Sequence, residues 1–184
     1  MVSFGRGNAT HWRHYCGGAI ISDSAIVSVA HCFFKNKHGY KRATKIRMGD
    51  GNHTDTADDD TLQIHEVNTI IRHHNYGSRT TFDVAIVHTK QKIRFNQNIK
   101  PLCVPTQSNS TIDKYFNHPV SLAGWGLDET GLASQNLRST SLKIYARSNC
   151  TSLYPYGKHL GNLLLCAGNQ VTNLRNIYLY AKDM

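Results

Sequence analysis

The sequence predicts an all-β protein, and three observations support this. Its 184 residues suffice for one domain, or for two small subdomains, with a buried core. The 42 Leu, Ile, Val and Phe residues, with a net charge of +9, favour a folded chain over a disordered one. Ile, Val and Thr number 37 and Tyr 9, and the apolar runs are short and separated by Gly, Asn, Asp and Ser. This pattern favours short strands over long helices.

Five apolar runs are predicted to be strands, and several alternate with a period of two residues. In chain order they are Ala25–Val29, Lys45–Met48, Phe82–Val87, Val120–Trp125 and Ser141–Tyr145. The segment 101–118 is rich in Pro, Ser, Asn and Thr and is predicted to link two halves of the chain. No apolar stretch approaches the roughly 18 residues of a membrane span, so we expect no membrane partner.

The cysteines and glycosylation motifs predict an extracellular, secreted protein. Cys16 with Cys32, and Cys150 with Cys166, each enclose 15 residues, a loop length at which a disulfide contributes about 3 kcal/mol. Four N-x-Ser/Thr sequons predict glycosylated asparagines at Asn8, Asn52, Asn109 and Asn149. The residues after Met1 lack the apolar core of a signal peptide, so we expect that the secreted precursor begins upstream.

Six short blocks occur in the order and approximate spacing of one known family. They are Cys16–Ile21, Ser28–Cys32, Phe82–Val87, Ile99–Pro105, Leu122–Gly126 and Leu165–Gly168, and they include Cys-Gly-Gly, Ala-His-Cys and Gly-Trp-Gly. Over residues 1–168 the chain resembles the trypsin-like serine proteases of the chymotrypsin fold, peptidase family S1. The resemblance implies a double Greek-key β-barrel with the active site between the barrels. It places the first barrel at about 1–100, the linker at 101–118, an incomplete second barrel at 119–168 and a divergent tail at 169–184.

The resemblance implies catalytic roles for His31 and Asp83. Acyl transfer from a peptide needs a nucleophilic hydroxyl, a base near neutral pKa and a carboxylate that orients the base. His31 adjoins a cysteine of the expected Cys16–Cys32 disulfide, which would hold the imidazole in place. Asp83 lies in an otherwise apolar strand, where a carboxylate is costly unless it accepts hydrogen bonds. The simpler interpretations are a histidine packed against a disulfide and a carboxylate at a strand end.

The catalytic serine is missing from this chain. In the family, the block that Leu165–Gly168 resembles is followed by Gly-Asp-Ser-Gly-Gly, which supplies the nucleophile and the oxyanion-hole N–H groups. Here no serine follows Ser152 and no glycine follows Gly168. Thr172 is a nearby hydroxyl, but nothing around it resembles the motif. We therefore expect the chain as written to be inactive.

The resemblance also implies that the chain is truncated at both ends. Met1–Phe4 is similar to an internal segment of the family, so Met1 is expected to be an internal methionine and the activation sequence to be absent. The pairs Cys16–Cys32 and Cys150–Cys166 match family disulfides. Cys103 is then left over, at a position that in many members bridges to an N-terminal propeptide or regulatory segment, and a buried free thiol is the alternative.

Two charged segments suggest further ligands. A basic cluster could bind a sulfated glycan, although solvated surface side chains are the simpler interpretation; it comprises Lys35, Lys37, Lys41, Arg42, Lys45 and Arg47. Aromatic residues do not interleave regularly with these side chains, so nucleic acid is not expected as a partner. The acidic stretch Asp50–Asp60 lies where some family members bind calcium, but it lacks the EF-hand pattern, and a flexible acidic loop is the alternative.

Neither zinc nor a cofactor is expected. The histidine pairs lack third and fourth ligands at a recurring spacing, and the cysteines are better used in disulfides; these pairs are His11 with His14 and His73 with His74.

The sequence thus predicts the domain of a serine endopeptidase, acting on protein or peptide substrates and blocked by protease inhibitors in the parent enzyme. The alternative is a non-catalytic secreted homologue that acts as a binding or decoy protein. A decoy would normally keep the closing strands of the second barrel, so truncation is the favoured interpretation.

Overall fold

The structure is a computed structural model that describes residues 1–33, 44–53, 61–77, 82–104, 115–127, 131–146, 164–168 and 178–181. Within these ranges the regular structure consists of strands and one short 3-10 helix, η1 (Ala30–Phe33). Across the same ranges, no helix has the length and apolar character needed to cross a bilayer. The predicted all-β class is therefore confirmed.

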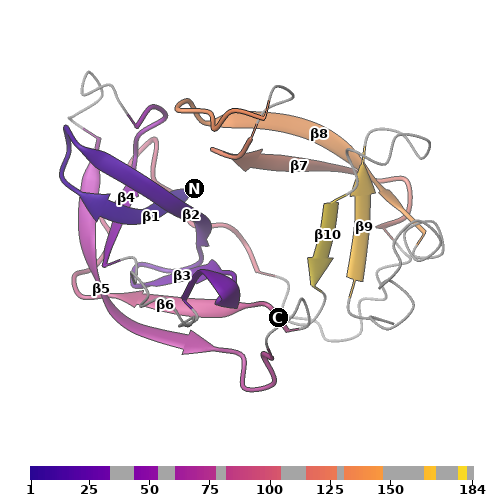
Figure 1. Cartoon of the computed structure of the whole chain (residues 1–184), viewed down its shortest axis with the longest axis horizontal. Helices are drawn as coiled ribbons and strands as arrows, with labels where there is room; N and C mark the ends of the chain where they lie inside the picture. The colour runs from indigo at the N-terminus through magenta and orange to yellow at the C-terminus, as the bar shows by residue number, and fades with distance from the viewer. Residues whose placement is uncertain are drawn as a thin grey trace. The chain divides into compact units, whose positions relative to one another are not determined.

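The first six strands form a closed antiparallel barrel (Figure 1). The strands are β1 (Val2–Gly7), β2 (Trp12–Ile20), β3 (Ala25–Ser28), β4 (Lys45–Met48), β5 (Gln63–Arg72) and β6 (Ala85–Thr89). Their order around the barrel is β1-β2-β3-β6-β5-β4, and pairing of β1 with β4 closes it. Closure leaves no strand edge of the barrel with unpaired N–H and C=O groups to attract another chain.

Alternation along the strands builds the core of the barrel. Val2 and Phe4 of β1 lie opposite Met48 and Ile46 of β4, and all four side chains are at most 1% exposed. The ring of Phe4 also meets Phe33 of η1 edge to face, with 5.2 Å between ring centroids. The short helix after β3 is thereby attached to the barrel interior.

Close packing explains one glycine of the Cys-Gly-Gly block. A Cβ atom on Gly18 would lie 2.8 Å from the Phe4 ring, 2.9 Å from the Val27 carbonyl oxygen and 3.0 Å from the Ile26 side chain. Real Cβ atoms do not approach neighbours so closely. Any side chain at this position would push β1 and β3 away from β2.

The remaining strands form a four-stranded sheet in the order β10-β9-β8-β7. Their bounds are β7 (Pro119–Gly124), β8 (Arg138–Tyr145), β9 (Leu164–Gly168) and β10 (Tyr178–Ala181). The tail supplies β10, in which Leu179 lies opposite Cys166. The chain divides into two compact units, and the one that contains the barrel also includes Ala123–Arg138. The predicted division at 101–118 stays a prediction.

The predicted strand positions agree with the structure except near Asp83. The run Phe82–Val87 was expected to be a strand, but β6 begins only at Ala85. Phe82 has φ of 54°, a left-handed conformation that bulky residues rarely adopt and that interrupts an extended strand. Asp83 therefore lies in the irregular segment that leads into β6.

A layer of polar and aromatic side chains packs outside the barrel. The Trp12 indole N–H donates to Ser3 Oγ over 2.8 Å, and that oxygen lies 2.7 Å from His14 Nδ1. His53 stacks on Trp125 with 4.5 Å between ring centroids, and the His14 ring lies 5.2 Å from His53. These contacts join β1 and β2 to residues that lie far away in the sequence.

Backbone hydrogen bonds hold the segment around Trp125 in the same unit. The N–H of His53 donates to the Gln135 carbonyl over 3.1 Å, and the N–H of Leu137 donates to the Gly51 carbonyl over 2.6 Å. The Trp125 indole N–H also points to the Gly51 carbonyl, at 3.4 Å. The barrel unit thus includes chain from beyond the predicted linker.

Arg47 corrects the interpretation of the basic cluster. Strand alternation places it outside the barrel opposite Ser3, but its side chain is only 1% exposed. It forms an ion pair with Asp50 and donates to the Ala9 carbonyl over 2.7 Å. Arg47 is therefore buried and does not belong to a surface cluster.

The ion pair of Arg47 also affects the interpretation of the acidic stretch 50–60. Asp50, its first carboxylate, pairs with Arg47 and also accepts the N–H of Asn52 over 2.6 Å. Residues 54–60 lie outside the described residues.

Of the basic cluster, Lys45 is described, and its ammonium donates to the Gly7 carbonyl over 2.9 Å.

The packing of Phe4 predicts that shortening this side chain strongly lowers the stability of the protein. Phe4→Ala is expected to lower the free energy of unfolding by about 3–5 kcal/mol, because it removes a fully buried ring and leaves a cavity. Phe95→Ala is the matched control, since that ring is 47% exposed; it should cost less than about 1 kcal/mol. Urea unfolding of the three proteins checks this, and equal losses would contradict the assigned core.

The His53 environment predicts acid destabilisation. Burial, and secondarily the charges of His14 and Arg47, lower the pKa of His53 to about 4. Because the folded state resists protonation, the stabilisation is complete above the ordinary pKa near 6.5 and is lost as the pH falls toward 4. Between pH 7.5 and 4.5 the loss should be about 2 kcal/mol.

Urea unfolding at both pH values measures this loss. His53→Phe, which keeps an aromatic ring for stacking but cannot titrate, should reduce the pH dependence by that amount. His74→Gln, at an exposed site, should leave it unchanged. An identical pH dependence in wild type and His53→Phe would show that His53 titrates normally.

Candidate active site

The pairing of β3 with β6 brings His31 and Asp83 together. Ser28, the last residue of β3, lies opposite Ala85, the first residue of β6. Because the strands are antiparallel, the chain leaving β3 and the chain entering β6 meet at the same end of the pair. His31 follows Ser28 by three residues and Asp83 precedes Ala85 by two.

The two side chains form a double contact. His31 Nδ1 lies 2.6 Å from Asp83 Oδ2, and the backbone N–H of His31 donates to Oδ1 over 2.7 Å. Both carboxylate oxygens therefore act on the same residue and fix its position. The His31 side chain is 61% exposed and that of Asp83 is 18% exposed. The imidazole thus has one nitrogen held by the protein while much of its surface remains accessible.

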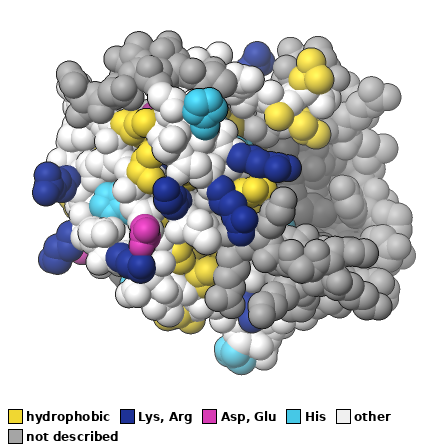
Figure 2. Space-filling view, turned by 60° about the vertical axis from the view of Figure 1, so that its left-hand side comes forward, with side chains coloured by type: hydrophobic (Ala, Val, Ile, Leu, Met, Phe, Trp, Pro, Cys, Tyr) yellow, Lys and Arg dark blue, Asp and Glu magenta, His cyan; other side chains and the backbone are white. Residues whose placement is uncertain are grey.

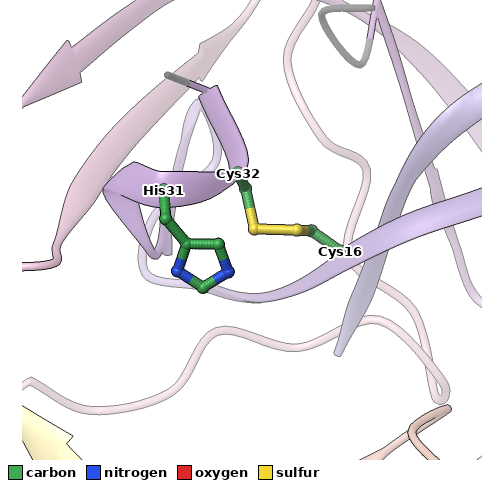
Figure 3. A group of neighbouring side chains, drawn as sticks. All are labelled: Cys16, His31 and Cys32. Atoms are coloured by element: carbon green, nitrogen blue, oxygen red, sulfur yellow. A yellow bond between two sulfur atoms is a disulfide. The ribbon is translucent and has the colours of Figure 1, made fainter. Parts of the chain in front are cut away.

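A disulfide attaches η1 to the barrel. Cys16 of β2 and Cys32 of η1 are bonded, with 6.3 Å between their Cα atoms. Figure 3 shows the His31 ring beside this disulfide, with one ring nitrogen on the side of the sulfur atoms. The backbone that carries His31 is therefore fixed on one side by Cys32 and on the other by Asp83.

The other cysteines are only partly described. Cys166 of β9 is disulfide-bonded and 3% exposed, whereas its expected partner Cys150 lies outside the described residues. Cys103 is free and exposed. The alternative of a buried thiol at Cys103 is therefore wrong.

The predicted glycosylation sites differ in their surroundings. Asn8 is exposed, and its side-chain oxygen accepts from the backbone N–H of His11 over 2.8 Å. Asn52 is half-buried. Asn109 and Asn149 lie outside the described residues, as does Thr172.

The conformation of Phe82 could not be predicted from the sequence. Its left-handed backbone turns the chain immediately before Asp83, and left-handed residues are usually Gly, Asn or Asp. A phenylalanine at this position gives no such signal.

A hollow of about 540 Å³ also exists on the barrel, but its lining includes Lys45, Glu66 and Lys90 and neither His31 nor Asp83.

Comparison with known proteins identifies the family. The sequence profile described as Trypsin matches residues 1–177. An ovochymase of Halocynthia roretzi is 33% identical over 162 residues, which cover 85% of this chain and 10% of the relative. A venom serine protease of Polistes dominula is 30% identical over 154 residues, 83% of this chain and 54% of the relative.

The relatives are longer than the region that they share with this chain. A CLIP domain-containing serine protease of Bombyx mori, HP8, is 27% identical over 168 residues, which cover 85% of this chain but 46% of the relative. The chain thus spans less than two thirds of each of these three proteins. The matched profile, the closed barrel and the six ordered blocks agree, and the chain belongs to the trypsin family of serine proteases.

Proposed function

We propose that this chain is the greater part of a serine endopeptidase domain in which His31 is the general base and acid and Asp83 orients it. The observation that supports this is the double contact of Asp83 with the Nδ1 atom and backbone N–H of one exposed histidine. A histidine packed only for stability would not need its second nitrogen left accessible. The geometry suits a base that takes a proton from a nucleophile.

The division of roles follows from the two ring nitrogens. With its proton on Nδ1 shared with Asp83, the imidazole presents the Nε2 lone pair to a hydroxyl. When Nε2 accepts that proton, the ring becomes a cation, and the neighbouring carboxylate stabilises it. The proton is later delivered to the leaving amine. Trypsin-like serine proteases generally need no cofactor for this reaction.

We also propose that residues 1–184 by themselves do not hydrolyse peptides. No serine follows Ser152 and the Gly-Asp-Ser-Gly-Gly motif does not occur in residues 1–184, so these residues do not supply the nucleophile that His31 would activate in the family. The second candidate is a non-catalytic binding or decoy protein, because such a homologue would also lack the nucleophile. Both candidates share the fold and differ in whether the His31–Asp83 pair is chemically competent.

Partners and location follow from the family. Serine proteases of this family have protein substrates or protein inhibitors as partners. We place the protein outside the cell, because it contains a disulfide and because one relative is by name a venom protease. The four sequons support glycosylation there.

A sulfated glycan is proposed as a secondary partner. The carboxylates within the described ranges all have cationic or histidine partners, namely Asp23, Asp50, Glu66 and Asp83. Lys and Arg side chains, drawn in dark blue, dominate the charged surface in Figure 2. The excess positive charge would attract a polyanion.

The missing nucleophile predicts an inactive chain that can be repaired. Residues 1–184 should show no fluorophosphonate labelling and no turnover of Arg-, Phe- or Ala-directed chromogenic peptides above a His31→Ala control. A chimera that adds the family's activation segment before Met1 and replaces residues 169–184 with a family segment containing Gly-Asp-Ser-Gly-Gly should gain turnover. His31→Ala in the chimera should abolish it, because the variant loses the proposed base.

Labelling of residues 1–184 in the absence of the added segments would contradict the inactivity claim. A folded chimera whose serine is present but whose turnover does not depend on His31 would reject the proposed base. A folded chimera with no turnover would favour the decoy.

The Asp83 contact predicts a spectroscopic signature that needs no activity. The Nδ1–H proton of His31, donated to a carboxylate at 2.6 Å, should give a resolved, strongly downfield proton resonance. Asp83→Asn should remove it or move it upfield, since a neutral amide is a weaker acceptor. In the active chimera the same change should lower kcat by about 10⁴.

The controls identify the resonance. His31→Ala should remove it, and His73→Gln, at a site distant in sequence, should retain it. A downfield resonance that survives Asp83→Asn would show that another group holds Nδ1.

A further inference from the structure

Asn8 lies in the short turn that joins β1 to β2. It begins the sequon Asn8-Ala9-Thr10, and Asn8, Thr10 and His11 are exposed. The backbone N–H of Asn8 donates to the His11 carbonyl over 3.0 Å, which closes the turn. The buried Arg47 holds the same turn, because its Nη1 atom donates to the Ala9 carbonyl over 2.7 Å. The turn therefore has a defined shape and presents its asparagine to solvent.

The contacts of the Asn8 side chain fix the orientation of its amide. Oδ1 accepts from the backbone N–H of His11 over 2.8 Å and from the Thr10 hydroxyl over 3.1 Å. An amide nitrogen does not accept hydrogen bonds, so the oxygen must face these two donors. The nitrogen, Nδ2, lies on the opposite side of the amide, away from both of them. Nδ2 is the atom of a sequon asparagine that receives an N-linked sugar.

A sugar on Nδ2 is compatible with these contacts. Nδ2 would keep one hydrogen and Oδ1 would keep both of its lone pairs, so the turn would lose neither of its two side-chain hydrogen bonds. Because Asn8 is exposed, the sugar extends into solvent and displaces no core side chain. A glycosylated Asn8 therefore fits the folded barrel.

Asn52 is the other sequon asparagine within the described residues, and its surroundings are more crowded. It is half-buried, and its backbone N–H donates to Asp50 Oδ1 over 2.6 Å. It pairs with Asn136 in an isolated antiparallel bridge, so the segment that follows Trp125 lies against it. The next residue, His53, is 8% exposed and stacks on Trp125. A bulky sugar at Asn52 would compete with this packing.

We propose that Asn8 carries an N-linked glycan and that Asn52 does not carry one in the folded protein. The inference rests on the extracellular location proposed above and not on peptidase activity. In the transfer, Asn8 Nδ2 forms a bond to the anomeric carbon of an oligosaccharide carried on a lipid pyrophosphate. The bond between that carbon and the pyrophosphate breaks, the pyrophosphate leaves with the electron pair, and Nδ2 gives up one proton to the transferring enzyme.

Folding makes two sequons of the same pattern unequal. Both asparagines are accessible in the unfolded chain. A chain that receives the sugar at Asn8 can still form the barrel unit, whereas a sugar at Asn52 must be accommodated against the segment around Asn136. Folded, secreted material should therefore carry the Asn8 glycan and should be depleted of chains modified at Asn52.

Secretion with a reporter sequon tests both parts of the proposal. Residues 1–184 are secreted from a eukaryotic host behind a cleavable signal, with Asn109→Gln and Asn149→Gln so that two of the four sequons remain. A C-terminal tag with its own sequon shows that each chain has met the transferring enzyme. N-glycosidase in heavy-oxygen water converts each glycosylated asparagine to a labelled aspartate, which mass spectrometry locates. Asn8 should be labelled in most chains, and at least about fivefold more often than Asn52.

Matched variants separate the modification from the turn that presents it. Asn8→Asp keeps an oxygen acceptor for the turn but has no Nδ2, so it should fold and lose the glycan at this position alone. Thr10→Ser keeps both the hydroxyl and the sequon and should keep the glycan, whereas Thr10→Ala should lose it. The urea midpoint of the secreted chain should not change when the glycans are trimmed to single sugars, because the hydrogen bonds of the turn survive.

Two outcomes overturn the proposal. The first is an unmodified Asn8 in chains whose tag is glycosylated. Because the signal and the tag secure entry to the secretory pathway, this result would leave the proposed location and the peptidase proposal untouched. The second is a folded, secreted chain in which Asn52 is modified as often as Asn8. Chain retained in the pathway gives the same measurement at Asn8, since the sugar is transferred before secretion.

Discussion

The register between β3 and β6 is the constraint on which the candidate site depends. Ser28 opposite Ala85 fixes where the chain leaves one strand and enters the other. A shift of β6 by one residue against β3 would reverse the faces of β6 and place apolar side chains such as Val87 outside the core. The hydrophobic pattern therefore sets the register, and the register sets the distance between His31 and Asp83. The geometry of the charged pair follows from apolar packing elsewhere in the barrel.

The structure uses polar contacts outside the barrel as well as apolar contacts inside it. Arg47 and Asp50 neutralise each other in a buried position, and His53 fits beneath Trp125 in its uncharged form. Removing one partner of such a pair leaves the other buried without compensation. The resulting loss of stability exceeds the stability that the intact pair contributes. We therefore expect acid to destabilise the barrel unit through this outer layer and not through its apolar core.

The sequence predicted the class, the family and the positions of β3, β4, β7 and β8, because these depend on local patterns. Alternating apolar residues marked β4 and β8, and the Ala-His-Cys block marked His31. Asp83 was predicted to lie within a strand, because the sequence shows no sign of the left-handed backbone at Phe82. It also counted Arg47 as a surface residue, since burial against Asp50 depends on the fold of the following loop. The stack of His53 on Trp125 joins residues 72 positions apart, and no local pattern reports such a contact.

The tight fit around Gly18 has a consequence for how family membership should be interpreted. The glycine is required because Phe4, Ile26 and the Val27 carbonyl leave no space for a side chain, and not because it takes part in a reaction. A glycine at this position is needed for the barrel to fold, whether or not a protein with this barrel cleaves peptides. The glycine of the Cys-Gly-Gly block is therefore evidence of architecture, and the ability to cleave peptides must be judged separately, from the groups that transfer protons.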